Sequence, residues 1–132
     1  MKYTRKGVYT YVYNKVAEAF PDAYISGKYE PVPASFPSVF IHEISSATAS
    51  ENVSLSGVQD VRRSTFEVQI RSNNQNDSLS KAYEILDVVF DAFKALYYIK
   101  SSQIVFDDGD STFRIVTQYR RVIGSAEEMP EE

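Results

Sequence analysis

The feature that most limits the folds open to this chain is the alternation of apolar and polar side chains along residues 61–71. Phe66, Val68 and Ile70 are apolar, whereas the positions between and beside them hold Thr, Glu, Gln and Arg. Successive side chains of a β-strand point to opposite faces of a sheet, so this alternation predicts a strand with one face buried and the other in water. We therefore expect a sheet with helices on one face only.

Two segments with a helical spacing of apolar residues can cover that buried face. Residues 6–20 form the first predicted helix, which ends at Pro21, and residues 78–99 form the longer second one. Other strands are predicted at residues 23–29, 39–44, 102–106 and 112–123, with an Asp-Asp-Gly-Asp turn between the last two. The expected fold class is α+β, a two-layer sandwich of the order α-β-β-β-α-β-β. Its mostly antiparallel sheet has about four to five strands, with two helices packed on one face.

The apolar surface of the predicted helix 78–99 is wider than one sheet face normally needs. Beside its core stripe runs a second row, which consists of Leu79, Tyr83, Phe90 and Tyr97. The extra width indicates either that the helix lies under both the sheet and the first helix, or that it contacts another subunit. In the first helix Tyr11 points away from the apolar stripe. We expect it to be exposed, either as an incidental surface residue or as a contact for another subunit.

The 132 residues fit a single domain, which we expect to span residues 1–124. A stretch rich in Ser, Ala, Thr and Asn predicts a long flexible loop at about 46–59, with Val53 and Leu55 among its few apolar residues. This loop could order against a neighbouring molecule or be merely mobile. The acidic tail at 125–132 is expected to be disordered. The sequence has no run of about 18 apolar residues, so we expect no membrane span. Its basic N-terminus is not followed by the apolar core of a signal peptide, which favours synthesis in the cytosol.

Residues that could catalyse a reaction or bind a cofactor are scarce. The chain has no Cys, which excludes disulfides, thiolate catalysis and cysteine-ligated metals, and its single histidine, His42, stands inside a predicted strand. No Gly-x-Ser-x-Gly motif accompanies it. Asp107, Asp108 and Asp110 lack the ligand spacing of a calcium loop, and the five glycines form no phosphate-binding loop. We therefore expect that the protein is not an enzyme and that it has no catalytic residue, metal site or cofactor.

Most arginines fall in two predicted strands. They are Arg62, Arg63, Arg71, Arg114, Arg120 and Arg121. If these strands pair, the arginines can form a basic patch on a chain whose net charge is −4. Such a patch could contact acidic groups on a neighbour, or DNA passing nearby, although the net charge opposes strong binding of nucleic acid. The alternative is a solvated strand face whose arginines pair with local acids.

The order of these elements resembles a known family. It comprises an N-terminal helix, a strand opened by Phe36-Pro37-Ser38-Val39-Phe40-Ile41, a long Ser/Ala/Thr loop, a Phe-Glu-Val-Gln-Ile strand, one long helix and a terminal hairpin. This layout, which covers nearly the whole chain, is similar to the tail-terminator or tail-completion proteins of long-tailed bacteriophages, and to related minor capsid and connector proteins.

The resemblance implies a viral structural protein that forms a homo-oligomeric ring, usually a hexamer. Such a ring caps the tail tube and joins it to the head, and DNA later passes through its bore without sequence-specific binding. The implied partners are other copies of the chain, the tail-tube protein and the head-connector protein. The implied location is the head–tail junction of the virion, after synthesis in the host cytoplasm.

Two other functions remain open beside a ring subunit. The chain could be an independent regulatory module that captures a peptide on a strand edge, or an undetected hydrolase that uses His42.

A head-to-tail ring needs two different surfaces on each subunit. The candidates for subunit contacts are Tyr11, Val53, Leu55, Leu79, Tyr83, Phe90 and Tyr97, together with the arginine-bearing strands.

Overall fold

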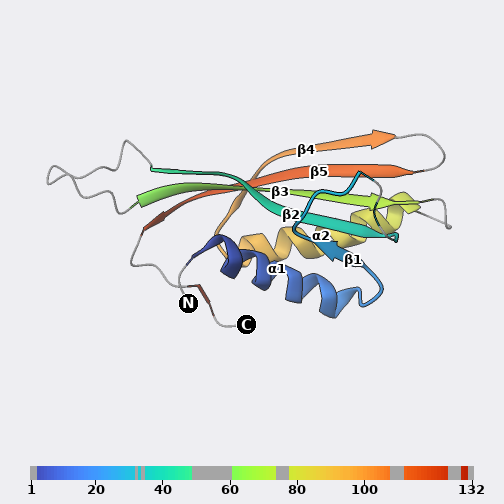
Figure 1. The fold of residues 1–132 in the computed structure, drawn as a ribbon, viewed down its shortest axis with the longest axis horizontal. Coiled ribbons are helices and arrows are strands. Elements are labelled where there is room, and N and C mark those ends of the chain that lie inside the picture. Colours follow the sequence, from blue (N-terminus) through green and yellow to red (C-terminus); the bar gives the residue numbers. More distant parts are fainter. Residues whose placement is uncertain are drawn as a thin grey trace, which may run out of the picture.

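The computed structural model of the chain shows the expected α+β fold, in which a layer of two helices packs against one five-stranded sheet (Figure 1). It describes residues 3–31, 33, 35–48, 61–73, 78–107, 112–124 and 129–130. In chain order the elements are α1 (Arg5–Ala19), β1 (Tyr24–Ser26), β2 (Ser38–Thr48), β3 (Val61–Ser72), α2 (Ser78–Ala95), β4 (Ile99–Asp107) and β5 (Phe113–Gly124). The order α-β-β-β-α-β-β is the predicted one.

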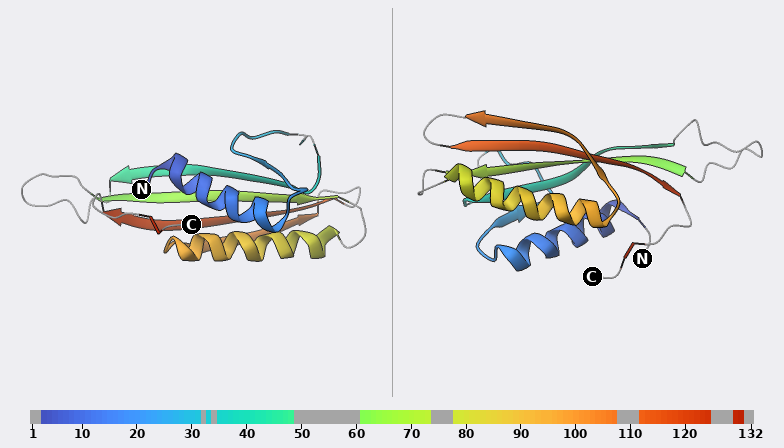
Figure 2. Two further views of the ribbon diagram at one scale, coloured as in Figure 1. Left: turned by 90° about the horizontal axis from the view of Figure 1, so that it is seen from below. Right: turned by 180° about the vertical axis from the view of Figure 1, so that it is seen from behind.

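The strands lie in the order β1-β2-β3-β5-β4, so that β5 is inserted between β3 and β4. The short β1 runs parallel to β2, and the other neighbouring strands of the described sheet are antiparallel. Both helices lie on one face of the sheet, below the strands in Figure 1, and the view from behind in Figure 2 shows the same arrangement. The helical layer therefore covers one face of the sheet, and β4 lies at an edge.

The alternation in β3 produces the core as predicted. Phe66, Val68 and Ile70 are fully buried. α2 lies over β3 and β5, where the Phe93 ring stacks on Tyr119 with the ring centroids 4.4 Å apart, and α1 contacts both α2 and β2. This position explains part of the wide apolar surface of α2, because the helix packs against the sheet on one side and against α1 on another.

α1 begins at a polar cap and buries more of its surface than its periodicity predicts. The Thr4 side chain accepts a hydrogen bond of 2.9 Å from the Gly7 backbone N–H, a donor that would otherwise lack a partner in the first turn. The expectation that Tyr11 is exposed is wrong, because its side chain is only 5% exposed. The ring lies at the boundary between the helices, near Val88, where the packing of α2 beside α1 covers it.

β2 is longer than the sequence suggested. It continues to Thr48, and its residues 46–48 pair with residues 62–64 of β3. The first three residues of the flexible loop expected at 46–59 are therefore strand, because pairing with β3 gives their backbone hydrogen-bond partners. The rest of that loop, including Val53 and Leu55, lies outside the described residues.

The prediction that the acidic tail at 125–132 is disordered needs correction at one position. Of this segment the structure describes Met129 and Pro130. Met129 is 8% exposed and belongs to the hydrophobic core, as does Tyr3 near the other end of the chain. Burying the one large apolar side chain of this acidic segment is favourable, so the chain returns to the domain here.

α2 ends at Ala95, before the predicted end at residue 99. Tyr97 has a φ of 65°, and the Tyr97 and Tyr98 N–H groups donate to the carbonyls of Lys94 and Phe93, each at 2.9 Å. This is a Schellman motif, which usually has Gly at the left-handed position and a hydrophobic contact beside it. That contact is the Tyr98 ring, edge-on to Phe93 with centroids 5.3 Å apart. The helix was predicted too long because a tyrosine stands where glycine usually marks the end.

A glycine at position 97 is expected to relieve strain in this turn. Left-handed backbone is unfavourable for a residue with a Cβ atom, so Tyr97→Gly should be about 1 kcal/mol more stable than Tyr97→Ala, which loses the same ring but keeps the strain. Urea denaturation of both variants, followed by circular dichroism, measures the difference. An alanine variant of equal or greater stability would contradict the left-handed turn.

Candidate assembly surfaces

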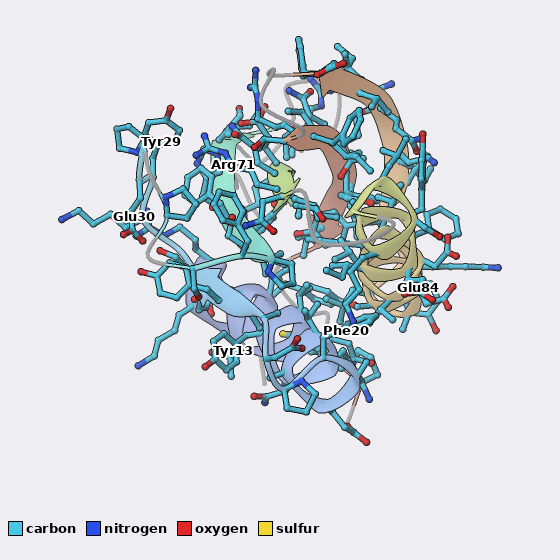
Figure 3. All side chains as sticks on the ribbon, turned by 90° about the vertical axis from the view of Figure 1, so that its right-hand side faces the viewer. Tyr13, Phe20, Tyr29, Glu30, Arg71 and Glu84 are labelled. Carbon is cyan, nitrogen blue, oxygen red and sulfur yellow. The ribbon has the colours of Figure 1, made fainter. Side chains whose placement is uncertain are left out.

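The face of the sheet that turns away from the helices carries a concentration of arginine. Side chains alternate between the two faces of β3 and β5, and the register pairs Arg71 with Arg114 and Thr65 with Arg120, on the face opposite the core. We call this surface the open sheet face. Its charged residues on β3 and β5 are Arg63, Arg71, Arg114, Arg120 and Glu67. Figure 3 shows Arg71 on the opposite side of the sheet from α2 and Glu84.

Two of the six arginines predicted to form a basic patch lie elsewhere. Arg62 and Arg121 point to the helix side of the sheet, because they have the opposite parity along their strands. Arg62 donates to Glu43 at 2.9 Å and to the Tyr3 carbonyl at 2.7 Å. Arg121 donates to the Leu96 carbonyl, just beyond α2, at 2.7 Å. The expectation of one patch of six arginines is therefore wrong, and four remain on the open sheet face.

The segment between β1 and β2 covers one corner of the open sheet face. Arg71 donates to the backbone carbonyls of Glu30 and Pro31 at 3.1 and 2.9 Å. Its guanidinium lies 5.6 Å from the centre of the Tyr29 ring, and Figure 3 shows the two side chains together on this side of the sheet. Arg71 therefore helps to hold this segment in place. The part of the face over β5 and β4 includes Arg120, which is exposed.

His42, the single histidine, lies on β2 as a strand residue, next to Glu67 of β3. Its Nε2 is 3.1 Å from Glu67 Oε2, and its ring stacks on Phe40 with centroids 4.2 Å apart. Gln118 and Gln69 also donate to Glu67, at 3.3 and 3.4 Å. Burial acts to raise the pKa of the Glu67 carboxyl, but these hydrogen bonds outweigh it and lower the pKa overall. Glu67 thus stays ionised and offsets part of the arginine charge.

β4 is a surface feature that the sequence did not reveal. All of its side chains are exposed except that of Ser102, which is partly buried. Its large apolar residues are Ile99, Ile104, Val105 and Phe106. The register pairs Ile104 with Val116 and Phe106 with Arg114, which places them on the open sheet face, and the Arg114 guanidinium lies 4.2 Å from the Phe106 ring centre. An uncovered apolar edge strand is typical of a surface that contacts another chain.

The candidate residues on and after α2 form a second exposed surface. Tyr83 and Phe90 are exposed on α2, Tyr97 in the turn after it is 71% exposed, and Leu79 is partly buried. Most of this row is therefore not covered by α1, and it lies beside a row of exposed acidic residues. We call this surface the acidic helix face, which consists of Tyr83, Glu84, Asp87, Phe90 and Asp91.

The described residues show neither a cluster of metal ligands nor a helix that could span a membrane. Among the described residues, no group of three or more His, Cys, Asp or Glu could hold a metal ion. Of the acidic turn, Asp107 ends β4, whereas Asp108 and Asp110 lie outside the described residues. Neither described helix is long and apolar enough to cross a bilayer.

The lowered pKa of Glu67 predicts a stability difference that depends on pH. Because the folded protein favours the ionised carboxyl, its contribution is present above the ordinary pKa of about 4.3 and is lost as pH falls through the lower folded value. Urea midpoints of wild type and Glu67→Gln should therefore differ most near neutral pH and converge at acidic pH. Glu84→Gln, on the acidic helix face, is the control. A wild-type advantage that does not change with pH would contradict the assignment.

Comparison of the chain with protein-family models found no match, and comparison with curated proteins found none either. The likeness to phage tail terminators therefore rests on the order and spacing of the elements. The features that bear on function are the open sheet face, the acidic helix face and the β4 edge.

Proposed function

We propose that this protein is a structural subunit of a phage virion, which assembles with copies of itself into a ring that ends the tail tube and joins it to the head connector. The observation that carries the proposal is the exposed apolar edge strand β4. Its nine residues include only two charged side chains, Lys100 and Asp107. Proteins that work as monomers usually protect a long edge strand with charge, proline or a covering segment. β4 has little such protection, which supports a working state in which another chain covers it.

The two exposed surfaces support a ring rather than a simple dimer. A symmetric dimer uses the same patch on both subunits, whereas a ring joins two different patches head to tail. The open sheet face is basic and the acidic helix face is negatively charged, so neither is complementary to itself. The phage assignment is supported by the layout of the chain, which resembles the tail terminators. In that setting the ring, of six copies, would lie at the head–tail junction after synthesis in the host cytoplasm.

A second candidate function is a regulatory module that captures an extended peptide on a strand edge. The same β4 edge favours it, because its outer backbone groups can pair with a strand from another protein. The two functions differ in their partners. A ring subunit binds copies of itself and the tail tube, whereas a peptide-binding module stays monomeric and binds a segment of a host protein.

Assembly on a tail tube tests the ring proposal. The purified chain and a tail-tube protein of a long-tailed phage are mixed during tube polymerisation, and tube lengths are measured by electron microscopy. We expect closed oligomers of one size in native mass spectrometry, and tubes that shorten as the molar ratio of this protein rises, because capped ends stop growing.

Substitutions on β4 provide the control for this experiment. Ile104→Lys introduces a charge on the exposed edge strand and should reduce both oligomerisation and capping, whereas Tyr13→Lys changes an exposed aromatic residue on α1 and should leave both unchanged. A chain that stays monomeric at every concentration and leaves tube length unaltered would contradict the ring proposal. Recovery of a host peptide on β4 under those conditions would favour the regulatory module.

A further inference from the structure

We propose that successive subunits contact each other by placing the open sheet face of one copy on the acidic helix face of the next. This inference rests on the proposed ring and identifies the two surfaces that form its interface. The partner is a second copy of the chain. The charges of the two surfaces, their apolar residues and the opposite directions in which they face each support this pairing.

The charges of the two surfaces are complementary. The open sheet face carries Arg63, Arg114 and Arg120 outside the corner that the β1–β2 segment covers, and among the described residues of β3 and β5 its one carboxylate is that of Glu67. The acidic helix face carries three carboxylates, those of Glu84, Asp87 and Asp91, which are all exposed on α2. Two ammonium groups lie beside them, that of Lys94 on α2 and that of Lys100, which is 5.3 Å from the centre of the Phe90 ring. Two sheet faces would repel each other, as would two helix faces. Contact between unlike faces removes both repulsions and steers the encounter of two subunits.

Each surface also provides apolar area for the centre of an interface. On the sheet, Ile104 is 53% exposed and lies beside Phe106 and the partly exposed Val116. On α2, Tyr83 and Phe90 flank the acidic row. Stable interfaces combine such an apolar and aromatic centre with a charged rim, and arginine and tyrosine are enriched in them. The two faces therefore match in composition as well as in charge.

The acidic helix face adjoins a recess that can receive a protruding side chain. This recess, of about 520 Å³, lies between α1 and α2, and Tyr11, Val88 and Ala92 contribute to its apolar lining. Glu18 and Asp91 lie beside them with Lys15, whose ammonium is 5.3 Å from the centre of the Tyr11 ring. An arginine stacked on an aromatic ring, as Arg114 is on Phe106, suits an apolar recess with carboxylates at its rim.

The two surfaces point in opposite directions, which decides the type of assembly. Arg71 and Glu84 lie on opposite sides of the sheet in Figure 3, with the helical layer between the sheet and Glu84. A contact between these two sides leaves the pair of subunits with one free surface of each kind. The interface therefore repeats from copy to copy, and it closes into a ring if the rotation per step divides a full turn.

Charge reversal separates this interface from others. The sheet variant carries Arg114→Glu and Arg120→Glu, and the helix variant carries Asp87→Lys and Asp91→Lys. Each variant alone places like charges on both sides of the contact, and we expect its self-association to weaken about tenfold or more. A control variant, Arg5→Glu with Lys6→Glu, makes the same charge change as the sheet variant at two exposed positions of α1. It should assemble like wild type, and urea denaturation checks that every variant folds.

The decisive measurement is whether assembly recovers when the sheet variant and the helix variant are mixed or combined in one chain. In an equimolar mixture the acidified sheet of one variant meets the basic helix of the other, so the mixture should form oligomers in which the two variants alternate, as counted by native mass spectrometry. A single chain with all four substitutions should also reassemble, including in rings of odd copy number. Sedimentation velocity at low and high salt measures both recoveries.

Three outcomes overturn the interface. One is that both variants assemble like wild type, and another is that each is monomeric but neither the mixture nor the four-substitution chain recovers. The third is that the sheet variant loses binding to a duplex oligonucleotide while its self-association is unchanged, which assigns the arginines to nucleic acid instead. Failure of the ring itself is distinguishable, because the wild-type chain is then monomeric and does not cap tubes.

Discussion

A buried carboxylate, Glu43, holds together the end of the sheet near the start of β4. Its side chain is 7% exposed and accepts hydrogen bonds from Arg62 at 2.9 Å and from Ser64 at 2.6 Å. The Tyr98 hydroxyl lies 2.8 Å from Ser64 Oγ, and burial raises the pKa of Tyr98 to about 12. A buried charge is tolerated only when such partners surround it. This network joins β2, β3 and the turn after α2.

The exposed surfaces follow from that internal network. Because Tyr98 is anchored on β3 and packed against Phe93, the chain turns sharply after α2, and Tyr97 takes the left-handed conformation. β4 then starts at Ile99 and runs along the outer side of β5, where it has one neighbouring strand in the described sheet. Arg121 of β5 adds its hydrogen bond to the carbonyl at the end of the helix. The apolar edge proposed for assembly is thus set by contacts in the core.

The spacing of apolar and polar residues along short segments predicted the parts of this structure that depend on neighbours in sequence. These include the buried face of β3, where Phe66, Val68 and Ile70 are fully buried. The end of α2 was missed because its left-handed residue is a tyrosine. The exposure of β4 was missed because an apolar strand has the same composition at the edge of a sheet as in its middle, and strand order depends on long-range pairing. The burial of Tyr11 likewise depends on where α2 packs.

The position of β5 between β3 and β4 has a consequence for synthesis on the ribosome. β5 follows both of its neighbours in sequence, so β3 has a free inner edge until residues 113–124 have emerged. Until then the core also lacks Tyr119, whose ring stacks on Phe93. Pairing of strands so distant in sequence is slow, and a nascent chain with an open strand edge is prone to aggregate. Completion of the sheet must therefore wait until β5 has been translated.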